Sequence, residues 1–323
     1  MDKDRIFGIQ SAGEFELLAL ETFAHQYHNV PIYREFCDHL GRQPAKIKNL
    51  REIPFLPIEF FKSHKVLSAA FQPEIVFRSS GTTGSVRSQH FVADTGLYRE
   101  SFTRGFEHFY GKPSEYCIAA LLPSYQERSD ASLSYMVGEL IGQSAHPKSG
   151  FYKVHEARQV LEILSESRTQ VLIIGVTFAL LDLVEKTIKT APNTIVMETG
   201  GMKGRRKEMV RGELHKILSE GFGQESIHSE YGMTELLSQA YSSGQGLFHC
   251  PPWMQVRIRD TEDPLSLLES GRTGGVDIID LANQHSCAFI ATQDLGKSYD
   301  NGTFEILGRF DHSDIRGCNL MAL

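Results

Sequence analysis

Residues 76–87 read VFRSSGTTGSVR, a short apolar segment followed by a loop that is rich in hydroxyl side chains and glycine. Backbone N–H groups and hydroxyls in such a loop can surround phosphate oxygens, and Arg87 can add a charge-assisted hydrogen bond at its end. No Gly-Lys-Ser/Thr closes the loop, so it is not a Walker A sequence. The whole run predicts a phosphate-binding loop, whereas an ordinary turn remains the alternative for the SGTTG core alone. The candidate nucleotide-binding residues in it are Ser79, Ser80, Gly81, Thr82, Thr83 and Gly84.

The pattern of apolar runs around this loop predicts an α/β fold. Up to about residue 245, runs of strand length alternate with helical segments, which favours a largely parallel or mixed sheet flanked by helices. After residue 246, short strand-like runs are separated by turn residues without helices, which indicates a small antiparallel β-subdomain. We therefore predict two units, residues 1–245 and residues 246–323. Strands are expected at 74–77, 116–122, 171–174, 194–197, 255–259, 276–281, 288–291 and 303–307, and helices at 13–28, 32–40, 131–141, 157–165, 178–190 and 205–219.

The composition limits the possible location and partners of the protein. The 323 residues include 33 Lys and Arg against 40 Asp and Glu, a net charge of −7, so no basic excess exists to neutralise nucleic-acid phosphates. The longest apolar stretch, Val171–Leu181, is interrupted by Gly175 and Thr177 and is too short to span a membrane. The first residues do not resemble a secretion signal, and the five cysteines form no CxxC pair. We expect a cytoplasmic protein with free thiols.

Four later segments accompany the loop. In chain order they are Glu198-Thr199-Gly200-Gly201, Tyr231-Gly232-Met233-Thr234-Glu235, Thr292-Gln293-Asp294 and Gly308-Arg309-Phe310-Asp311. Together with residues 76–87 they resemble the motifs of adenylate-forming enzymes, the superfamily of acyl-coenzyme A ligases, luciferases and nonribosomal-peptide adenylation domains. The resemblance implies the fold of that superfamily's N-terminal domain, with ATP or AMP as the bound nucleotide and Mg²⁺ as the metal ion.

The adenine end of the nucleotide would lie beside the first two of these segments. The resemblance implies that Gly200 and Gly201 belong to a backbone wall next to the adenine. Tyr231 offers a flat face to the purine, although an aromatic residue after a strand is more often part of a core. Gly232 and Met233 follow it in the same motif and complete this part of the candidate nucleotide site.

The phosphates, the metal ion and the ribose would meet the polar residues of the motifs. Thr234 can hydrogen-bond an α-phosphate, and Glu235 is a hard oxygen ligand for Mg²⁺ that ATP carries. For Glu235, the alternative is a carboxylate that complements a helix dipole. Asp294 can accept hydrogen bonds from both ribose hydroxyls, and Arg309 can join it. Gln293 replaces the glycine that is usual before this aspartate but leaves the carboxylate in place.

The end of the sequence points to one branch of the superfamily. Only twelve residues follow Asp311, so we expect the C-terminal lid domain of typical members, with its lysine, to be absent. Residues 315–320 read IRGCNL and residues 54–66 read PFLPIEFFKSHKV, and both resemble the LuxE-like acyl-protein synthetases. Those proteins move an activated fatty acyl group to their own cysteine near the C-terminus. The resemblance gives this role to Cys318, with Arg316 close enough in sequence to favour the thiolate.

The leading hypothesis is an ATP- and Mg²⁺-dependent acyl-protein synthetase for a fatty acid, with Cys318, Glu235, Thr234 and Arg87 as catalytic residues. An acyl tunnel is expected between residues 200–203 and the helices after Ser124. An acyl reductase or an acyl-carrier protein is the expected partner. A catalytically impaired nucleotide- or acyl-binding subunit is the alternative, and a ligase that uses coenzyme A is a third hypothesis. The remaining cysteines, Cys37, Cys117, Cys250 and Cys287, are expected in the core.

Overall fold

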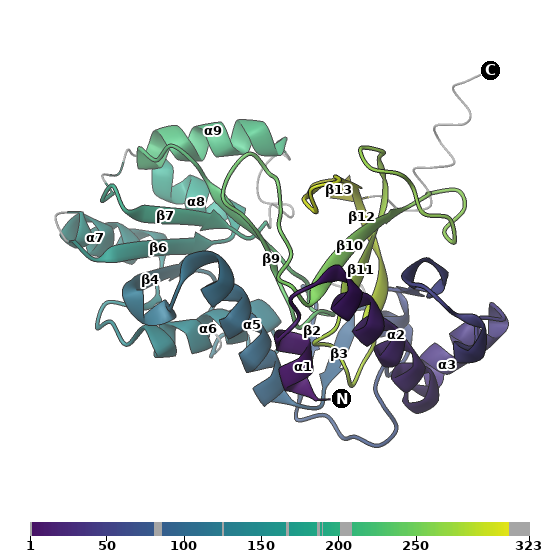
Figure 1. Cartoon of the computed structure of the whole chain (residues 1–323). Coiled ribbons are helices and arrows are strands. Elements are labelled where there is room, and N and C mark those ends of the chain that lie inside the picture. Colours follow the sequence, from purple (N-terminus) through teal and green to yellow (C-terminus); the bar gives the residue numbers. More distant parts are fainter. Residues whose placement is uncertain are drawn as a thin grey trace.

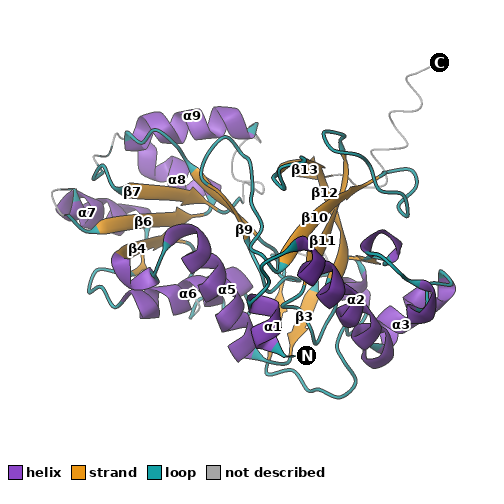
Figure 2. Cartoon of the chain, viewed as in Figure 1, coloured by secondary structure: helices purple, strands orange, loops and turns teal. Residues whose placement is uncertain are grey.

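The computed structural model describes residues 2–80, 86–124, 126–165, 168–185, 188, 190–200 and 209–309. Its described part contains a six-stranded sheet, a five-stranded sheet and a two-stranded hairpin. The six-stranded sheet lies on the left of Figure 1 with helices on both of its faces, and the five-stranded sheet lies on the right beside the N-terminal helices. The strands and the helices that flank them are distinguished in Figure 2. This arrangement confirms the predicted α/β fold class.

The six-stranded sheet has the order β5-β4-β6-β7-β8-β9. All its neighbours are parallel except β8 and β9, which are antiparallel. Strands that are covered on both faces consist of continuous apolar runs, and every residue of β4 is buried. The bounds are β4 Tyr116–Leu121, β5 Gly150–Phe151, β6 Gln170–Gly175, β7 Thr194–Glu198, β8 His228–Tyr231 and β9 Ala240–Ser242.

Helices cover both faces of this sheet. On one face, Ile118 and Ala120 of β4 belong to the same core as α5 (Thr95–Tyr110) and α6 (Ser132–Ser144). On the other face, Cys117 and Ala119 pack in a second core, together with α7 (Val154–Leu164), α8 (Thr177–Val184) and α9 (Arg211–Phe222). The alternation of side chains along β4 therefore separates two cores.

Helix α5 is not among the predicted helices. Asp94 caps its N-terminus by accepting a hydrogen bond from the backbone N–H of Leu97 (2.9 Å). Its buried side chains include Tyr98, Phe102 and Phe106, which lie at helical spacing but among charged residues and Gly105. The apolar residues of this segment follow the period of a helix, but the charged residues and the glycine between them hide this pattern in the sequence.

The five-stranded sheet has the order β1-β12-β11-β10. Strand β13 pairs with residues 294–298 of β12, beyond the residues that pair with β1. Its C-terminal strands are antiparallel, as predicted, but β1 pairs with β12 in parallel through Leu56 and Pro57. The N-terminal part of the chain therefore contributes to this sheet, and a division at residue 245 stays a prediction. The bounds are β1 Leu56–Pro57, β10 Met254–Arg259, β11 Gly274–Asp280, β12 Phe289–Ser298 and β13 Phe304–Arg309.

The N-terminal helices pack beside this sheet. Helix α2 (Ala12–Asn29) begins with a capping box between Ser11 and Glu14 and is followed by α3 (Pro31–His39). The ring of Phe289 in β12 lies 6.3 Å from that of Phe23 in α2 and is stacked at 6.1 Å on that of Tyr33 in α3. The shorter elements are α1 Lys3–Phe7, η1 Pro44–Lys46, η2 Leu50–Glu52, α4 Phe60–Ser63, β2 Ile75–Arg78, β3 Gln89–Val92 and η3 Pro113–Glu115.

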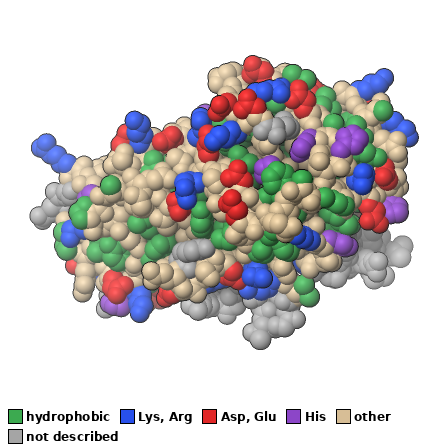
Figure 3. Space-filling model, turned by 90° about the horizontal axis from the view of Figure 1, so that it is seen from below, with side chains coloured by type: hydrophobic (Ala, Val, Ile, Leu, Met, Phe, Trp, Pro, Cys, Tyr) green, Lys and Arg blue, Asp and Glu red, His purple; other side chains and the backbone are tan. Residues whose placement is uncertain are grey.

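The surface agrees with the charge composition. On the face drawn in Figure 3, acidic and basic side chains are interspersed, and no large area has a single sign. None of the helices in the described residues combines the length and the apolar character that crossing a membrane would require.

Gln26 of α2 provides a test of the contact between the N-terminal helices and the C-terminal sheet. Its fully buried amide donates to the carbonyls of Asn283 (2.7 Å) and Gln284 (3.0 Å) and accepts from Ala288 N–H (2.9 Å). Gln26→Ala should lower the free energy of unfolding by about 2–4 kcal/mol, because buried backbone groups lose their partner. Gln43→Ala, at an exposed glutamine, should change it by less than about 0.5 kcal/mol. Urea unfolding of both variants measures this, and equal losses would contradict it.

Candidate active site

The hairpin β2–β3 holds the predicted phosphate loop at its base. Ser79 N–H donates to the Ser88 carbonyl (3.1 Å), and Ser88 N–H donates to Ser79 Oγ (3.0 Å). The loop therefore leaves and re-enters the hairpin at paired positions next to Ser80. The predicted loop residues Gly81, Thr82, Thr83 and Gly84 lie outside the described residues, so their contacts with phosphate stay a prediction.

Arg87 fastens the base of this loop. Its guanidinium donates to the carbonyls of Ser79 (2.5 Å) and Arg78 (3.2 Å) and forms an ion pair with Asp130 (2.7 Å). Burial opposes ionisation of Asp130, but the contact with Arg87 holds the pKa of Asp130 below its usual value. The structure thus gives Arg87 a protein partner for its charge, whereas the sequence predicted a phosphate contact, which stays a prediction.

Tyr231, Asp294 and Arg309 come from three different strands and meet in one hydrogen-bonded group. The Tyr231 hydroxyl donates to Asp294 Oδ2 (2.7 Å), and Arg309 Nε donates to Asp294 Oδ1 (2.9 Å). Asp294 is buried, whereas the Arg309 side chain is 64% exposed. Burial and the neighbouring Asp294 carboxylate raise the pKa of Tyr231 well above its usual value, so its hydroxyl stays a donor. Three residues that the sequence predicted from separate motifs are thereby brought together.

Residues on either side of Asp294 explain how its strand accommodates Gln293. Asp294 N–H donates to Thr292 Oγ1 (3.0 Å), whose hydroxyl donates to the Val276 carbonyl (2.8 Å). Gln293 is directed to the other face of β12, where its amide donates to Glu59 Oε1 (2.5 Å). Because side chains alternate along a strand, the glutamine does not compete with Asp294 for the site.

Thr234 and Glu235 follow β8 and are held by polar contacts. The Thr234 carbonyl accepts from a ring nitrogen of His90 (2.8 Å), and the Glu235 carbonyl accepts from Asn283 Nδ2 (2.8 Å). The Glu235 side chain is buried and accepts a hydrogen bond from Ser88. Burial raises the pKa of Glu235, so a cation beside it would favour its ionised form.

Glu235 fits Mg²⁺ as a single protein ligand. Mg²⁺ is commonly bound by one or two carboxylates together with phosphate oxygens and water. Among the residues that the structure describes, no group of three or more His, Cys, Asp or Glu side chains could hold a metal ion. If Mg²⁺ binds here, Glu235 would hold it together with phosphate oxygens, to which the ion would supply positive charge.

The segment after β7 turns sharply at Gly200. Glu198 is buried, and its Oε2 accepts from Gly200 N–H (2.7 Å), while Arg211 (3.6 Å) and His215 (3.7 Å) lie near Oε1. Burial disfavours its charge, but these contacts keep the pKa of Glu198 below its usual value. Gly200 has φ +72°, a conformation that favours glycine. Gly201, the second predicted residue of this wall, lies outside the described residues.

Glu230 is a functional candidate that the sequence motifs did not identify. It lies on β8 directly opposite Tyr241 of β9, on the face of the strand away from Tyr231. Burial, and then the charge of Glu198, raise the pKa of Glu230 to about 8. A strongly perturbed carboxyl next to a candidate site is typical of functional positions, and only the fold reveals it.

The four described cysteines are free thiols, in agreement with the sequence prediction. Cys37, Cys117 and Cys287 are buried, and Cys250 is partly buried. Burial raises the pKa of Cys37 and of Cys250 to about 12, which makes their thiolates scarce at neutral pH. Cys318, Phe310 and Asp311 lie outside the described residues.

The raised pKa of Glu230 predicts how stability depends on pH. Between its ordinary pKa and about 8, the folded chain keeps a proton that the unfolded chain has lost, so stability should fall as pH rises from 5 to 8. Glu230→Gln removes this term and should flatten the curve, making the variant more stable than the wild type at pH 8 by roughly 1–3 kcal/mol. Urea unfolding at several pH values measures this. Parallel curves for the two proteins would show that Glu230 is not the group concerned.

Comparison with known proteins adds to this geometry. The family model described as acyl-protein synthetase, LuxE, matches residues 11–322. A long-chain-fatty-acid–luciferin-component ligase of Vibrio harveyi is 22% identical, over 93% of this chain and 84% of its own length.

Solved structures resemble the fold at low sequence identity. ATP-bound MatB from Rhodopseudomonas palustris has a TM-score of 0.55 at 17% identity and covers 72% of this chain; the match spans 47% of MatB, about half its length. A 2-hydroxyisobutyryl-CoA ligase in complex with 2-HIB-AMP and CoA has a TM-score of 0.68 at 14% identity, over 94% of this chain and 70% of its own. The fold is therefore similar to that of these ligases. The family match over nearly the whole sequence shows that this chain belongs to the LuxE family of acyl-protein synthetases.

Proposed function

We propose that this protein activates a fatty carboxylic acid as an acyl-adenylate and transfers the acyl group to a cysteine thiol. The observation that carries this proposal is the convergence of motif residues on the five residues from Tyr231 to Glu235. Asp294 and Arg309 meet the first of these residues, and Ser88, at the end of the hydroxyl-rich loop, meets the last. Nucleoside and phosphate contacts are then available on one continuous segment.

In the first step, a carboxylate oxygen of the acid attacks the α-phosphorus of ATP, and pyrophosphate leaves. Asp294, whose two oxygens are oriented by Tyr231 and Arg309, accepts hydrogen bonds from the ribose hydroxyls. Thr234 and the loop hydroxyls bind phosphate oxygens, and Glu235 binds Mg²⁺, which supplies charge stabilisation to the phosphates. The ATP- and AMP-ester-bound structures of similar fold support the choice of nucleotide.

In the second step, a thiolate attacks the carbonyl carbon of the mixed anhydride, and AMP leaves as the thioester forms. Cys318 is the proposed nucleophile. Supporting this choice, burial raises the pKa of each of the other four cysteines, which makes them poor nucleophiles. The name of the Vibrio harveyi relative supports a long-chain fatty acid as the substrate. An acyl reductase or acyl-carrier protein is the proposed recipient, in a reducing cytoplasmic setting that keeps the thiol free.

Exchange of labelled pyrophosphate into ATP, measured with a panel of carboxylic acids, tests the first step. The wild type should catalyse exchange with fatty acids. Glu235→Gln should slow exchange by roughly two to three orders of magnitude, because the carboxylate that binds the metal ion loses its charge. Glu213→Gln, at an exposed position of α9, should exchange like the wild type.

Two results would contradict the proposal in different ways. Near-normal exchange by Glu235→Gln would exclude the metal-binding role of Glu235. Absence of exchange with every acid, in a wild type that binds AMP, would favour a nucleotide-binding subunit without catalysis.

Labelling with radioactive fatty acid and ATP tests the second step. The protein itself should carry a label that survives denaturation and is released by neutral hydroxylamine, as a thioester is. Cys318→Ser should abolish this label but preserve pyrophosphate exchange, because serine provides almost no alkoxide at neutral pH. Cys250→Ser is the matched control and should keep the label.

A label that persists in Cys318→Ser would place the acyl group on another residue. Acyl transfer to added coenzyme A, without any protein label, would instead favour a coenzyme A ligase. Loss of both label and exchange would mean that Cys318 supports the fold.

A further inference from the structure

We propose that His90 is a positioning residue that holds the backbone of Thr234 and thereby sets Thr234 and Glu235 against the nucleotide phosphates. The inference rests on the proposed function, because that function assigns the phosphate and metal roles to these two residues. His90 belongs to β3 and precedes Thr234 by 144 residues in the sequence. No motif includes it, and its ring is buried.

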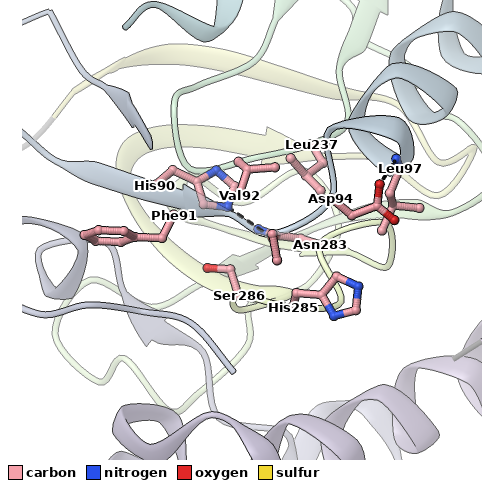
Figure 4. A pocket seen from close by; sticks show the side chains of 10 residues that line it. His90, Phe91, Val92, Asp94, Leu97, Leu237, Asn283, His285 and Ser286 are labelled. Atoms are coloured by element: carbon pink, nitrogen blue, oxygen red, sulfur yellow. Dashed lines mark hydrogen bonds between the residues drawn. The ribbon is translucent and has the colours of Figure 1, made fainter. Parts of the chain in front are cut away.

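The contacts around His90 show which ring nitrogen donates a hydrogen bond to Thr234. Asn283 Nδ2 donates to the carbonyls of Glu235 (2.8 Å) and Cys287 (3.0 Å), so its Oδ1 is the atom that faces His90 Nε2, at 3.3 Å. Figure 4 shows this contact between His90 and Asn283. On the other side of the ring, Nδ1 lies 2.8 Å from the Thr234 carbonyl.

Both ring nitrogens therefore face oxygen acceptors, although a neutral imidazole can donate only once. The shorter contact identifies the donor as Nδ1–H, and Thr234 as the residue that His90 holds. Burial lowers the pKa of His90 to about 4, which keeps the ring neutral at neutral pH. The Phe61 ring packs against the imidazole in a T-shaped arrangement, with 5.8 Å between the ring centroids.

The position of His90 on β3 connects the two phosphate-binding parts of the site. Ser88, the residue directly before β3, donates to the Glu235 side chain and pairs with Ser79 at the base of the loop. Strand β3 and the residue before it thus contact both Thr234 and Glu235 and carry the end of the hydroxyl-rich loop. A shift of Thr234 would change its distance to any phosphate that the loop binds.

A small cavity beside His90 is not itself a ligand site. It encloses about 10 Å³ and is lined by residues that include His90, Asn283, His285 and Ser286 (Figure 4). That volume holds at most one water molecule. His285 is a useful control. Its imidazole lines the same cavity, but in the described part of the structure it forms no hydrogen bond with residues 234–235.

The loss of His90 should act locally. Asp280 independently accepts hydrogen bonds from Leu237 N–H (2.7 Å) and Ser238 N–H (3.0 Å), so the chain beyond Glu235 keeps its anchor. The group of Tyr231, Asp294 and Arg309 lies on the other side of Thr234 and does not involve His90. Nucleoside binding should therefore survive a change that impairs phosphate binding.

Four variants test the proposal: His90→Asn, His90→Gln, His90→Leu and His285→Leu. An asparagine amide can occupy the place of Nδ1 and reach the Thr234 carbonyl, whereas a glutamine amide occupies the place of Nε2 and reaches only Asn283. Dissociation constants for adenosine and ATP separate the two halves of the site. His90→Leu and His90→Gln should bind ATP at least tenfold more weakly and adenosine as the wild type does. His90→Asn and His285→Leu should remain within about threefold of the wild type for both ligands.

Hydrogen exchange provides a readout that needs no nucleotide. Backbone amides in residues 232–235 should exchange at least tenfold faster in His90→Leu than in the wild type, while those of β10 and the Asp280-bound amides of Leu237 and Ser238 should be unchanged. If the wild type fails to bind nucleotides, the proposed function is wrong, and hydrogen exchange alone decides whether His90 holds the segment.

Three results would overturn the proposal. Equal loss of adenosine and ATP affinity in His90→Leu would indicate a general structural role. Equal behaviour of the Asn and Gln variants would exclude the Nδ1 contact as the one that matters. Unchanged exchange of residues 232–235 in His90→Leu would show that His90 does not hold Thr234.

Discussion

The arrangement of the site depends on the hydrogen bonds that the buried carboxylate of Asp280 accepts. It lies at the end of β11 and accepts hydrogen bonds from Leu237 N–H, Ser238 N–H, Ser238 Oγ and Ala282 N–H. Burial raises the pKa of Asp280, while these donors oppose the shift. Burying a carboxylate without such donors would destabilise the fold. The hydrogen bonds to Asp280 therefore hold the segment between β8 and β9 against the end of β11. This contact joins the six-stranded sheet to the five-stranded sheet where the motif residues converge.

The five-stranded sheet carries support from the N-terminal helices to the same place. Gln26 binds the backbone of residues 283–288, and this loop presents Asn283 to Glu235. Arg259 of β10 donates to the Thr292 carbonyl of β12 (2.5 Å) and to Asp277 (2.5 Å). The Thr292 hydroxyl in turn accepts from Asp294 N–H. The site is therefore assembled from parts of the chain that are more than 200 residues apart. Buried polar side chains such as Gln26 find their hydrogen-bond partners in these distant segments and not among their sequence neighbours.

The sequence predicts what local pattern determines and fails where the partner is distant. Buried parallel strands such as β4 consist of continuous apolar residues, so their positions were predictable. The motifs also identified Tyr231, Asp294 and Arg309, which the structure brings together. No local pattern distinguishes His90, Asn283 or Asp280 from ordinary polar residues, because each acquires its role from a partner elsewhere in the chain. The same reason explains Arg87: its sequence position suggests a phosphate contact, while the fold supplies Asp130 as a partner.

The segment from Tyr231 to Glu235 is held at its two ends by different parts of the structure. Asp294 and Arg309, from the five-stranded sheet, hold Tyr231, whereas β3 and Asn283 hold Thr234 and Glu235. Gly232 lies between these ends, and a Cβ atom there would come within 2.4 Å of Glu230 Oε1 and 3.2 Å of Gln239 Cγ. A side chain at this position would therefore require the Glu230 carboxyl group to turn away and Gln239 to shift by a few tenths of an ångström. Each end therefore has its own anchors, so the end that we propose to bind the nucleoside and the end that we propose to bind the phosphates are supported independently.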